Sequence, residues 1–474
     1  MAKKNELPAL IASLALTVAL LGGGAWWLKD RLFVDGGGGS SISQNGGDAG
    51  NTSGSTTGGI DINGNGTGAS VLPVAVSPTK QKGLEALAAG DYNTAKVEFT
   101  TALNEQKNDP ESLIYLNNAE IGDGNAHLIA ISVPAGASVN TASELLRGAA
   151  QAQTDINESG GINGTPIKLL LVNDNDDSEQ AKTIATELVN NPDVLGVVGH
   201  YSSGTTLAAA EVYEAGKLPM VSATSTAVSI STAGDYIFRT VPSDRLAAGT
   251  LSRFVIEKLN KQKAAVFFTS DSTYSKSVKS EFTQELLTSG GEVVIDFDVS
   301  EPGFSAGRAV QAANDAGADV IMLALTTNTI DAANQVISVN ASNLPLVGGD
   351  SMYNVKVLDV GRENAEGLTV AVPWHILSHE GTDFVSTSRN LWGGDVNWRT
   401  ATAYDAVQAL AAGLSRAPNR EGLAAALADT SLAIDGATNP IRFLPSGDRN
   451  QPSQLVEVVP GTRSGTGFDY EPVN

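Results

Sequence analysis

The chain contains 474 residues, and its 52 acidic residues outnumber its 30 basic ones to give a formal net charge of −22. This acidity, with no basic stripe, argues against nucleic acid as a partner and against broad adhesion to anionic lipid. The chain has no cysteine, which excludes disulfides, cysteine-ligated zinc, thiol catalysis and a lipid-modified cysteine. Any membrane attachment must therefore come from the polypeptide itself.

The first 34 residues are predicted to be a membrane anchor or a signal peptide. An uncharged run covers residues 7–28 and contains Trp26 and Trp27 near its end. As a helix, this run is just long enough to span a bilayer core, and paired tryptophans suit the membrane interface. The small residues of GGGA at positions 22–25 leave a cleaved signal peptide as the alternative. The length of the run favours an uncleaved transmembrane helix that holds the remaining chain outside the cytoplasm.

Residues 35–77 are predicted to form a flexible linker, because glycine, serine, asparagine, threonine and aspartate dominate as far as residue 70. Residues 78–122 carry two apolar helical stripes separated by the turn GDY, and then NDP before another helical segment. This pattern resembles a tetratricopeptide repeat, with one helical pair and the first helix of a second. Since solenoids normally need three or more repeats, two interpretations stay open: a small helical hairpin packed on the next domain, or a module that docks a protein partner.

The main body begins at residue 126 and alternates strand and helix as far as residue 410. HLIAISVP predicts a strand, the segment 143–159 an amphipathic helix, and TPIKLLLVND the next strand. This alternation predicts an α/β fold with doubly wound parallel sheets. About 335 residues exceed a single hydrophobic core, so two lobes are expected.

Two polar turns follow neighbouring apolar strands within residues 197–228. The first turn contains Ser202, Ser203 and Gly204 and opens a helix, whose positive end is a seat for a carboxylate. The second turn contains Ser225 and Thr226. Because ligands of open parallel sheets bind at the carboxyl edge of the strands, both turns are predicted to border one pocket for a small polar molecule.

GHYSSGTTLAAAEVYEAGKLPMVSATST in this stretch resembles the core of the type I periplasmic binding proteins, the branched-chain amino-acid (leucine/isoleucine/valine) receptor family of ABC transporters. Further ordered matches are DINESGGINGTPIKLLLVNDNDDSEQA, FRTVPSDRLAAG, SDSTYSKS, DAGADVIMLA, LPLVGGD and NAEGLTVAVPW. The resemblance spans about residues 126–461. It implies a two-lobed ligand-binding domain over residues 126–474 with three crossings of the chain, near residues 242–245, near 372–375 and after 433. Lobe 1 would then contain about residues 126–243 and 374–432, and lobe 2 about residues 244–373 and 433–463.

The resemblance also implies how an amino acid would be held. Ser203, Thr226 and nearby N–H groups such as that of Gly204 would bind its carboxylate, and Asp350, Thr226 and the Ser225 carbonyl its ammonium group. Tyr274 would close over the ligand. The chain departs from the branched-chain receptors at Thr326, Thr327 and Thr141, where the receptors carry aromatic residues. Loss of these apolar walls favours a smaller or more polar amino acid than leucine.

Three other patterns are considered as catalytic or metal sites. The serine turn lacks a G-x-S-x-G elbow, and no acidic residue can be assigned from sequence to orient His200. Residues 173–177 (NDNDD) lack the glycine and distal glutamate of a calcium loop, and Asp177 with Gln180 is better interpreted as a helix cap. His375 and His379 have zinc-like spacing but are expected in a loop, where Trp374 and His375 line the hinge side of the cleft.

The sequence therefore predicts a binding protein without catalytic residues, metal or cofactor. The favoured function is an extracytoplasmic solute-binding protein that captures a small amino acid for an ABC permease and is anchored to the cytoplasmic membrane. The alternative is a membrane-tethered amino-acid or amide sensor, or a scaffold, whose helical hairpin docks a signalling partner.

Overall fold

The computed structural model describes residues 68–438 and 440–473. The predicted anchor lies outside these residues. Within the described part of the chain, no helix combines the length and the apolar character needed to cross a membrane.

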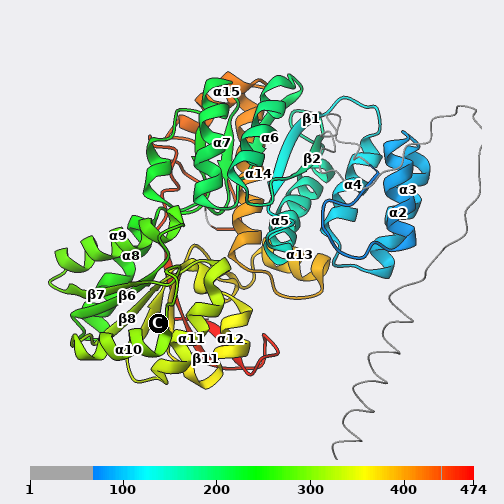
Figure 1. Ribbon diagram of the computed structural model, residues 1–474. Helices are drawn as coiled ribbons and strands as arrows, with labels where there is room; N and C mark the ends of the chain where they lie inside the picture. Colours follow the sequence, from blue (N-terminus) through cyan, green and yellow to red (C-terminus); the bar gives the residue numbers. More distant parts are fainter. Residues whose placement is uncertain (1–67, 439, 474) are drawn as a thin grey trace, which may run out of the picture. The chain divides into compact units, whose positions relative to one another are not determined.

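The first sheet contains five parallel strands, in the order β2-β1-β3-β4-β5. The labels β1 and β2 mark this sheet in Figure 1. Successive residues of a strand face opposite sides, and here both faces are covered. Ile129 and Ile131 pack in one core with α5 and α14, whereas Leu128 and Ala130 pack in another with α6 and α7. The strands are β1 (His127–Val133), β2 (Ile167–Asn173), β3 (Val194–Val198), β4 (Met220–Ser222) and β5 (Ile237–Arg239), and the helices of this lobe are α5 (Val139–Glu158), α6 (Ser178–Asn190), α7 (Ser203–Ala215), α13 (Asp383–Trp392), α14 (Trp398–Arg416) and α15 (Arg420–Ala428).

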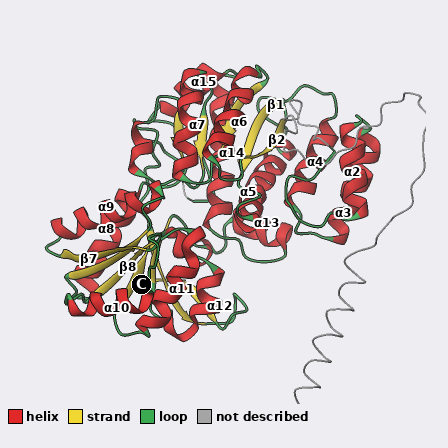
Figure 2. Ribbon diagram, in the orientation of Figure 1, coloured by secondary structure: helices red, strands yellow, loops and turns green. Residues whose placement is uncertain are grey.

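The second sheet has the order β12-β11-β10-β9-β8-β6-β7, with five parallel strands extended by an antiparallel hairpin. The labels β7 and β8 mark this sheet in Figure 2. Its faces are again divided: Val266 packs with α8 and α9, whereas Phe267 packs with α10, α11 and α12. The strands are β6 (Lys263–Phe268), β7 (Glu292–Asp298), β8 (Val320–Ala324), β9 (Leu346–Gly348), β10 (Thr369–Val372), β11 (Gln454–Pro460) and β12 (Phe468–Pro472). The helices are α8 (Asp244–Arg253), α9 (Thr273–Thr288), α10 (Ala306–Asp315), α11 (Ile330–Asn340) and α12 (Val355–Gly361). Short helical turns cover Val228–Thr232, Phe254–Lys258, Thr327–Thr329, Asp350–Met352, Arg362–Asn364 and Ile376–His379.

The last crossing between the lobes lies later than the sequence analysis places it. Two residues beyond the predicted boundary still contact the first lobe: Asp448 pairs with Arg239 of β5 at 2.7 Å, and Thr438 donates a hydrogen bond to Asp405 of α14. The chain joins the second sheet only at β11, which begins at Gln454. The expected boundary after residue 433 is therefore wrong by about 20 residues, because tertiary ion pairs hold a segment that has no regular pattern of its own.

In the described part of the chain, three helices precede the first sheet: α2 (Pro78–Ala88), α3 (Tyr92–Glu105) and α4 (Pro110–Ile121). α2 and α3 approach closely at Gly83, where a Cβ atom would lie 2.8 Å from the Phe99 ring. α4 is fastened to the edge strand β2, because the Asn118 amide donates to the Leu169 carbonyl at 2.9 Å and accepts from its N–H at 3.2 Å. This side chain occupies the hydrogen-bonding groups that an edge strand leaves open. These contacts match the interpretation of a small helical hairpin packed on the next domain.

The segment predicted as a linker is ordered at its described end. Ser70 and the N–H of Val71 both donate to the carboxylate of Glu111 on α4, and Leu72 is 5% exposed. Lys80 of α2 pairs with the same buried carboxylate at 2.8 Å. The linker prediction fails here because Glu111, 40 residues away, supplies partners that local composition cannot reveal.

Candidate functional site

A cavity of about 320 Å³ lies where the carboxyl ends of the two sheets meet. The first lobe contributes Asp176, the start of α7 and Thr224, and the second lobe contributes the start of α9, the turn after β8 and the turn after β9. Of the predicted ligand-binding residues, the lining includes Ser203, Gly204, Tyr274, Thr326 and Asp350. The hydroxyl groups of Tyr201 and Thr327 meet across the cleft at 2.9 Å.

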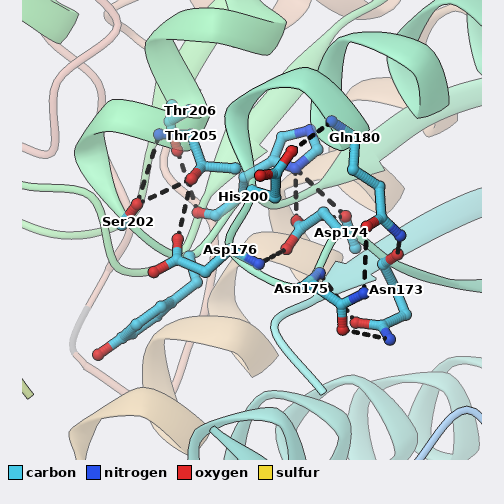
Figure 3. Close-up of polar contacts among 12 residues, drawn as sticks. Asn173, Asp174, Asn175, Asp176, Gln180, His200, Ser202, Thr205 and Thr206 are labelled. Atoms are coloured by element: carbon cyan, nitrogen blue, oxygen red, sulfur yellow. Dashed lines mark hydrogen bonds and ion pairs between the residues drawn. The ribbon is translucent and has the colours of Figure 1, made fainter. Parts of the chain in front are cut away.

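The first polar turn forms the N-terminus of α7, as its sequence predicts. Ser202 is the N-cap, and its Oγ accepts from the N–H of Thr205 at 3.4 Å. The Thr205 hydroxyl in turn donates to Asp176 at 2.9 Å (Figure 3). Burial raises the pKa of Asp176, while the hydroxyls of Ser202 and Thr205 oppose the rise. Helix N–H groups at this edge give the cavity a seat for an anion.

The second polar turn lies behind the cavity wall. Ser225 and Thr226 are almost fully buried, and Thr224 is the residue of this turn that lines the cavity. The Ser225 carbonyl accepts from the Arg239 guanidinium at 3.3 Å, and the Ser225 hydroxyl lies 3.0 Å from the Tyr201 carbonyl. The Ser225 carbonyl, which was expected to face an ammonium group, thus has a buried arginine as a partner, and Ser225 does not line the cavity.

Asp350 lies at the end of the second lobe's cavity wall, directly after β9. The N–H of Ser351 donates to the Tyr274 hydroxyl at 3.4 Å, which places the start of α9 against this turn. Burial raises the pKa of Asp350 to about 6, and the positive charge of Arg399 opposes the rise. A carboxylate that is costly to ionise in the empty cleft gains most from a cationic ligand.

Asp244 is a neighbouring acid that the sequence analysis did not assign. It begins α8 and is 2% exposed, and its Oδ2 has no hydrogen-bond partner among the described residues. Burial raises its pKa to about 7, and the charge of Asp350 adds to the rise while the nearby hydroxyls of Ser277 and Thr226 oppose it. The only sequence signal was its position in FRTVPSDRLAAG, a segment that the family resemblance covers.

Arg399 and Trp398, at the start of α14, also line the cavity and were missed. Arg399 is 5% exposed, and its guanidinium lies over the Trp398 ring at 4.3 Å. No local motif marks these residues as part of a site, because they open a helix whose remaining length packs in the core.

Thr141 lies outside this cavity. It borders a second cavity of about 500 Å³, which shares Thr327 and Arg399 with the first and is also bordered by Tyr353 and Tyr470. The Thr141 backbone N–H is capped by Ser138 at the start of α5. Thr326 keeps its predicted place in the first cavity, where it forms a mutual cap with Thr329.

His200 has an acidic partner that the sequence analysis did not find. Its Nδ1 lies 2.6 Å from Asp174 (Figure 3). The same nitrogen lies 3.2 Å from the Ser132 hydroxyl, and Nε2 lies 3.0 Å from the Tyr213 hydroxyl. All of these side chains are buried beneath the cavity wall. A nucleophilic triad needs serine and aspartate on opposite ring nitrogens, so this network is structural. The His200 carbonyl accepts the hydroxyls of Thr206 and Ser222, which fixes both polar turns.

The remaining metal candidates are residues 173–177 and the pair His375 and His379. Asp177 caps α6 by accepting from the N–H of Gln180 at 2.8 Å, as predicted. His375 is buried, which lowers its pKa to about 4, and Nδ1 of His379 donates a hydrogen bond to the His375 carbonyl at 3.1 Å. Neither His375 nor Trp374 borders either cavity, contrary to the expected place at the cleft. Across residues 68–438 and 440–473, no cluster of acidic or histidine side chains is suited to hold a metal ion.

Two parallel-sheet lobes that place a polar cavity between their strand ends, with an anion seat on one side and a carboxylate on the other, define a solute-binding protein. Residues 128–465 match the family model described as "Periplasmic binding protein", and the chain belongs to this family.

Named relatives agree with this membership. The chain is 26% identical over 318 residues to the Leu/Ile/Val-binding protein of Escherichia coli K12, an alignment that covers 64% of this chain and 82% of that protein. It is 31% identical over 161 residues to the "Amino acid binding protein" of Pseudomonas aeruginosa, covering 34% and 43% of the two chains. An ABC transporter substrate-binding protein from Desulfitobacterium hafniense, solved in complex with Leu, has a TM-score of 0.62 at 25% identity and covers 73% of this chain and 100% of that one. A Rhodopseudomonas palustris solute-binding protein in complex with 3,4-dihydroxybenzoic acid shares the fold at 17% identity and a TM-score of 0.63, covering 73% and 96% of the two chains.

Proposed function

We propose that this chain captures a small polar α-amino acid in the 320 Å³ cavity and delivers it to an ABC-type importer from outside the cytoplasmic membrane. The observation that carries the proposal is the pair of seats in one cavity: the N-terminus of α7 and the carboxylate of Asp350. A zwitterion presents one charge to each seat. The names of the relatives support an amino acid and an ABC transporter over the alternative of a sensor or scaffold.

The ligand carboxylate lies at the start of α7, near the side chain of Ser203 and the N–H of Gly204. Gly204 suits this position because a Cβ there would meet nothing closer than the Thr273 hydroxyl at 3.6 Å, so a ligand can approach the backbone. The ammonium group pairs with Asp350 through a charge-assisted hydrogen bond. Tyr274 and the turn at Thr326 close the cavity from the second lobe, and closure of the two lobes favours the bound state. This arrangement binds and does not cleave, so the chain acts without catalysis.

The test uses ligands that differ by one charged group. Binding of an α-amino acid to the purified full-length protein is compared by calorimetry with binding of the amine that lacks its carboxylate and of the acid that lacks its ammonium group. We expect each deletion to weaken binding at least tenfold, because each leaves one seat unpaired. Benzoate and 3,4-dihydroxybenzoate form the opposing arm. Binding of either as tightly as the amino acid would refute the two-seat arrangement.

The same proposal includes attachment to the membrane by residues 7–28. The support is the uncharged length of this run and the absence of cysteine from the sequence. Mass spectrometry of the N-terminus in membrane and soluble fractions tests it. An intact N-terminus in the membrane fraction is expected, and a soluble protein that begins near residue 25 would show a cleaved signal peptide instead.

A further inference from the structure

Arg399 is a buried cation without an anionic or hydrogen-bonding partner for its side chain. It is 5% exposed, and its guanidinium makes no hydrogen bond and no ion pair within 4.0 Å to any described residue. The guanidinium does lie over the Trp398 ring, in a cation–π contact. By contrast, the buried Arg239 binds Asp448 at 2.7 Å and the Ala227 carbonyl at 2.8 Å. A buried charge is costly unless it is paired, so the environment of Arg399 lacks an acceptor.

A ligand in the cavity could supply the acceptor that Arg399 lacks. Arg399 borders both the 320 Å³ cavity and the adjoining 500 Å³ cavity, and it stands at the positive end of α14. A second buried donor is unpaired beside it, because Nε1 of Trp398 has no hydrogen-bond partner among the described residues. Asp350 is near enough for Arg399 to oppose the rise of its pKa, yet the two side chains form no ion pair within 4.0 Å. Asp350 therefore stays available to a ligand ammonium group.

The second cavity leaves room for a ligand side chain next to Arg399. Thr327 and Arg399 border both cavities, so a ligand side chain that leaves the first cavity towards the second passes Arg399. An apolar side chain there would leave the guanidinium unpaired. A terminal carboxylate would pair with two of its N–H groups at once, and a carboxamide oxygen would accept at least one.

We propose that Arg399 forms a subsite for a terminal oxygen acceptor on the ligand, so that the amino acid has an acidic or carboxamide side chain. This inference rests on the proposed function, since it assumes that α7 and Asp350 hold the backbone groups of an α-amino acid. Aspartate and asparagine have branched side chains close in shape to that of leucine. Unlike leucine, they carry an oxygen that can accept a hydrogen bond from Arg399.

The experiment measures dissociation constants of aspartate, asparagine, glutamate, glutamine and leucine with the full-length protein and with R399M. For the wild type we expect at least one of the oxygen-bearing ligands to bind tenfold or more tightly than leucine. R399M keeps an unbranched apolar chain but no donor, so its binding of that ligand falls about thirtyfold or more, while leucine binding is kept or improved. Comparing acid with amide then shows whether the charge or only the oxygen is recognised.

The matched control is R463M. Arg463 borders the second cavity only, and it already pairs with Asp395 at 2.9 Å, so its loss should change ligand preference less than threefold. If R399M does not fold, the wild-type ligand panel still decides. Leucine binding as tightly as the best oxygen-bearing ligand, with dependence on Asp350 intact, overturns the subsite but leaves the amino-acid function. Failure of all five amino acids to bind, while another α-amino acid such as serine binds, overturns the subsite alone. Failure of every α-amino acid to bind would refute the proposed function itself.

Discussion

Replacing Asp350 by asparagine should change ligand affinity and stability in opposite directions. The substitution keeps the shape of the side chain and removes its charge. In the empty protein, burial raises the pKa of Asp350 from 3.8 to about 6, so the folded state holds the proton more tightly than the unfolded state does. The associated stability is present below pH 4 and is lost as the pH rises through about 6.

The magnitudes follow from these values. Two pKa units correspond to about 3 kcal/mol. At pH 8 and without ligand, the free energy of unfolding of D350N should therefore exceed that of the wild type by up to about 3 kcal/mol. A bound ammonium group loses its partner, which costs about 2–5 kcal/mol, or roughly thirtyfold to several thousandfold in affinity. In the wild type, affinity should fall by about a factor of ten between pH 7 and pH 5 as Asp350 takes up its proton.

Urea denaturation of the unliganded proteins and calorimetric titration with the amino acid, both at pH 5 and pH 8, provide the assay. The asparagine variant should lose the part of the pH dependence that Asp350 causes, with Asp244 and Asp176 as the remaining titrating groups near the cavity. The ammonium assignment is refuted if D350N binds the amino acid within about threefold of the wild type, a difference below 1 kcal/mol.

Three further outcomes are expected. K80M should lower the free energy of unfolding by about 3–5 kcal/mol in urea titration, because it leaves the buried carboxylate of Glu111 without its cation; a loss below 1 kcal/mol would contradict this. Y201F removes the hydrogen bond to Thr327 across the cleft and should weaken ligand binding about two- to tenfold, whereas unchanged affinity would mean that the contact does not favour the closed state. Removing residues 1–67 leaves every described contact in place, so the Tm and the affinity should stay the same, and a clear fall in either would refute this.

The expected alternation of strands and helices is present, and the first polar turn forms a helix N-terminus because its signals are local. Ser202 caps α7 and Asp177 caps α6 through residues two or three positions away, and such spacing is visible in a sequence. Asp350 and Tyr274 could likewise be placed at the cavity, because the resemblance to a known family ordered their segments correctly along the chain.

The features of the site that the sequence did not predict depend on residues that are distant along the chain. His200 finds Asp174 and Tyr213 only when three segments of the first lobe come together, and the Ser225 carbonyl has Arg239 as a partner. Thr141 and Thr226 leave the expected cavity wall, while Arg399 enters it from the start of a core helix. Composition, periodicity and capping describe a residue's immediate neighbours along the chain. Burial and charge pairing depend on which segments pack together, so the tertiary structure alone decided that Arg399 and Trp398 join the predicted polar residues at the cavity wall.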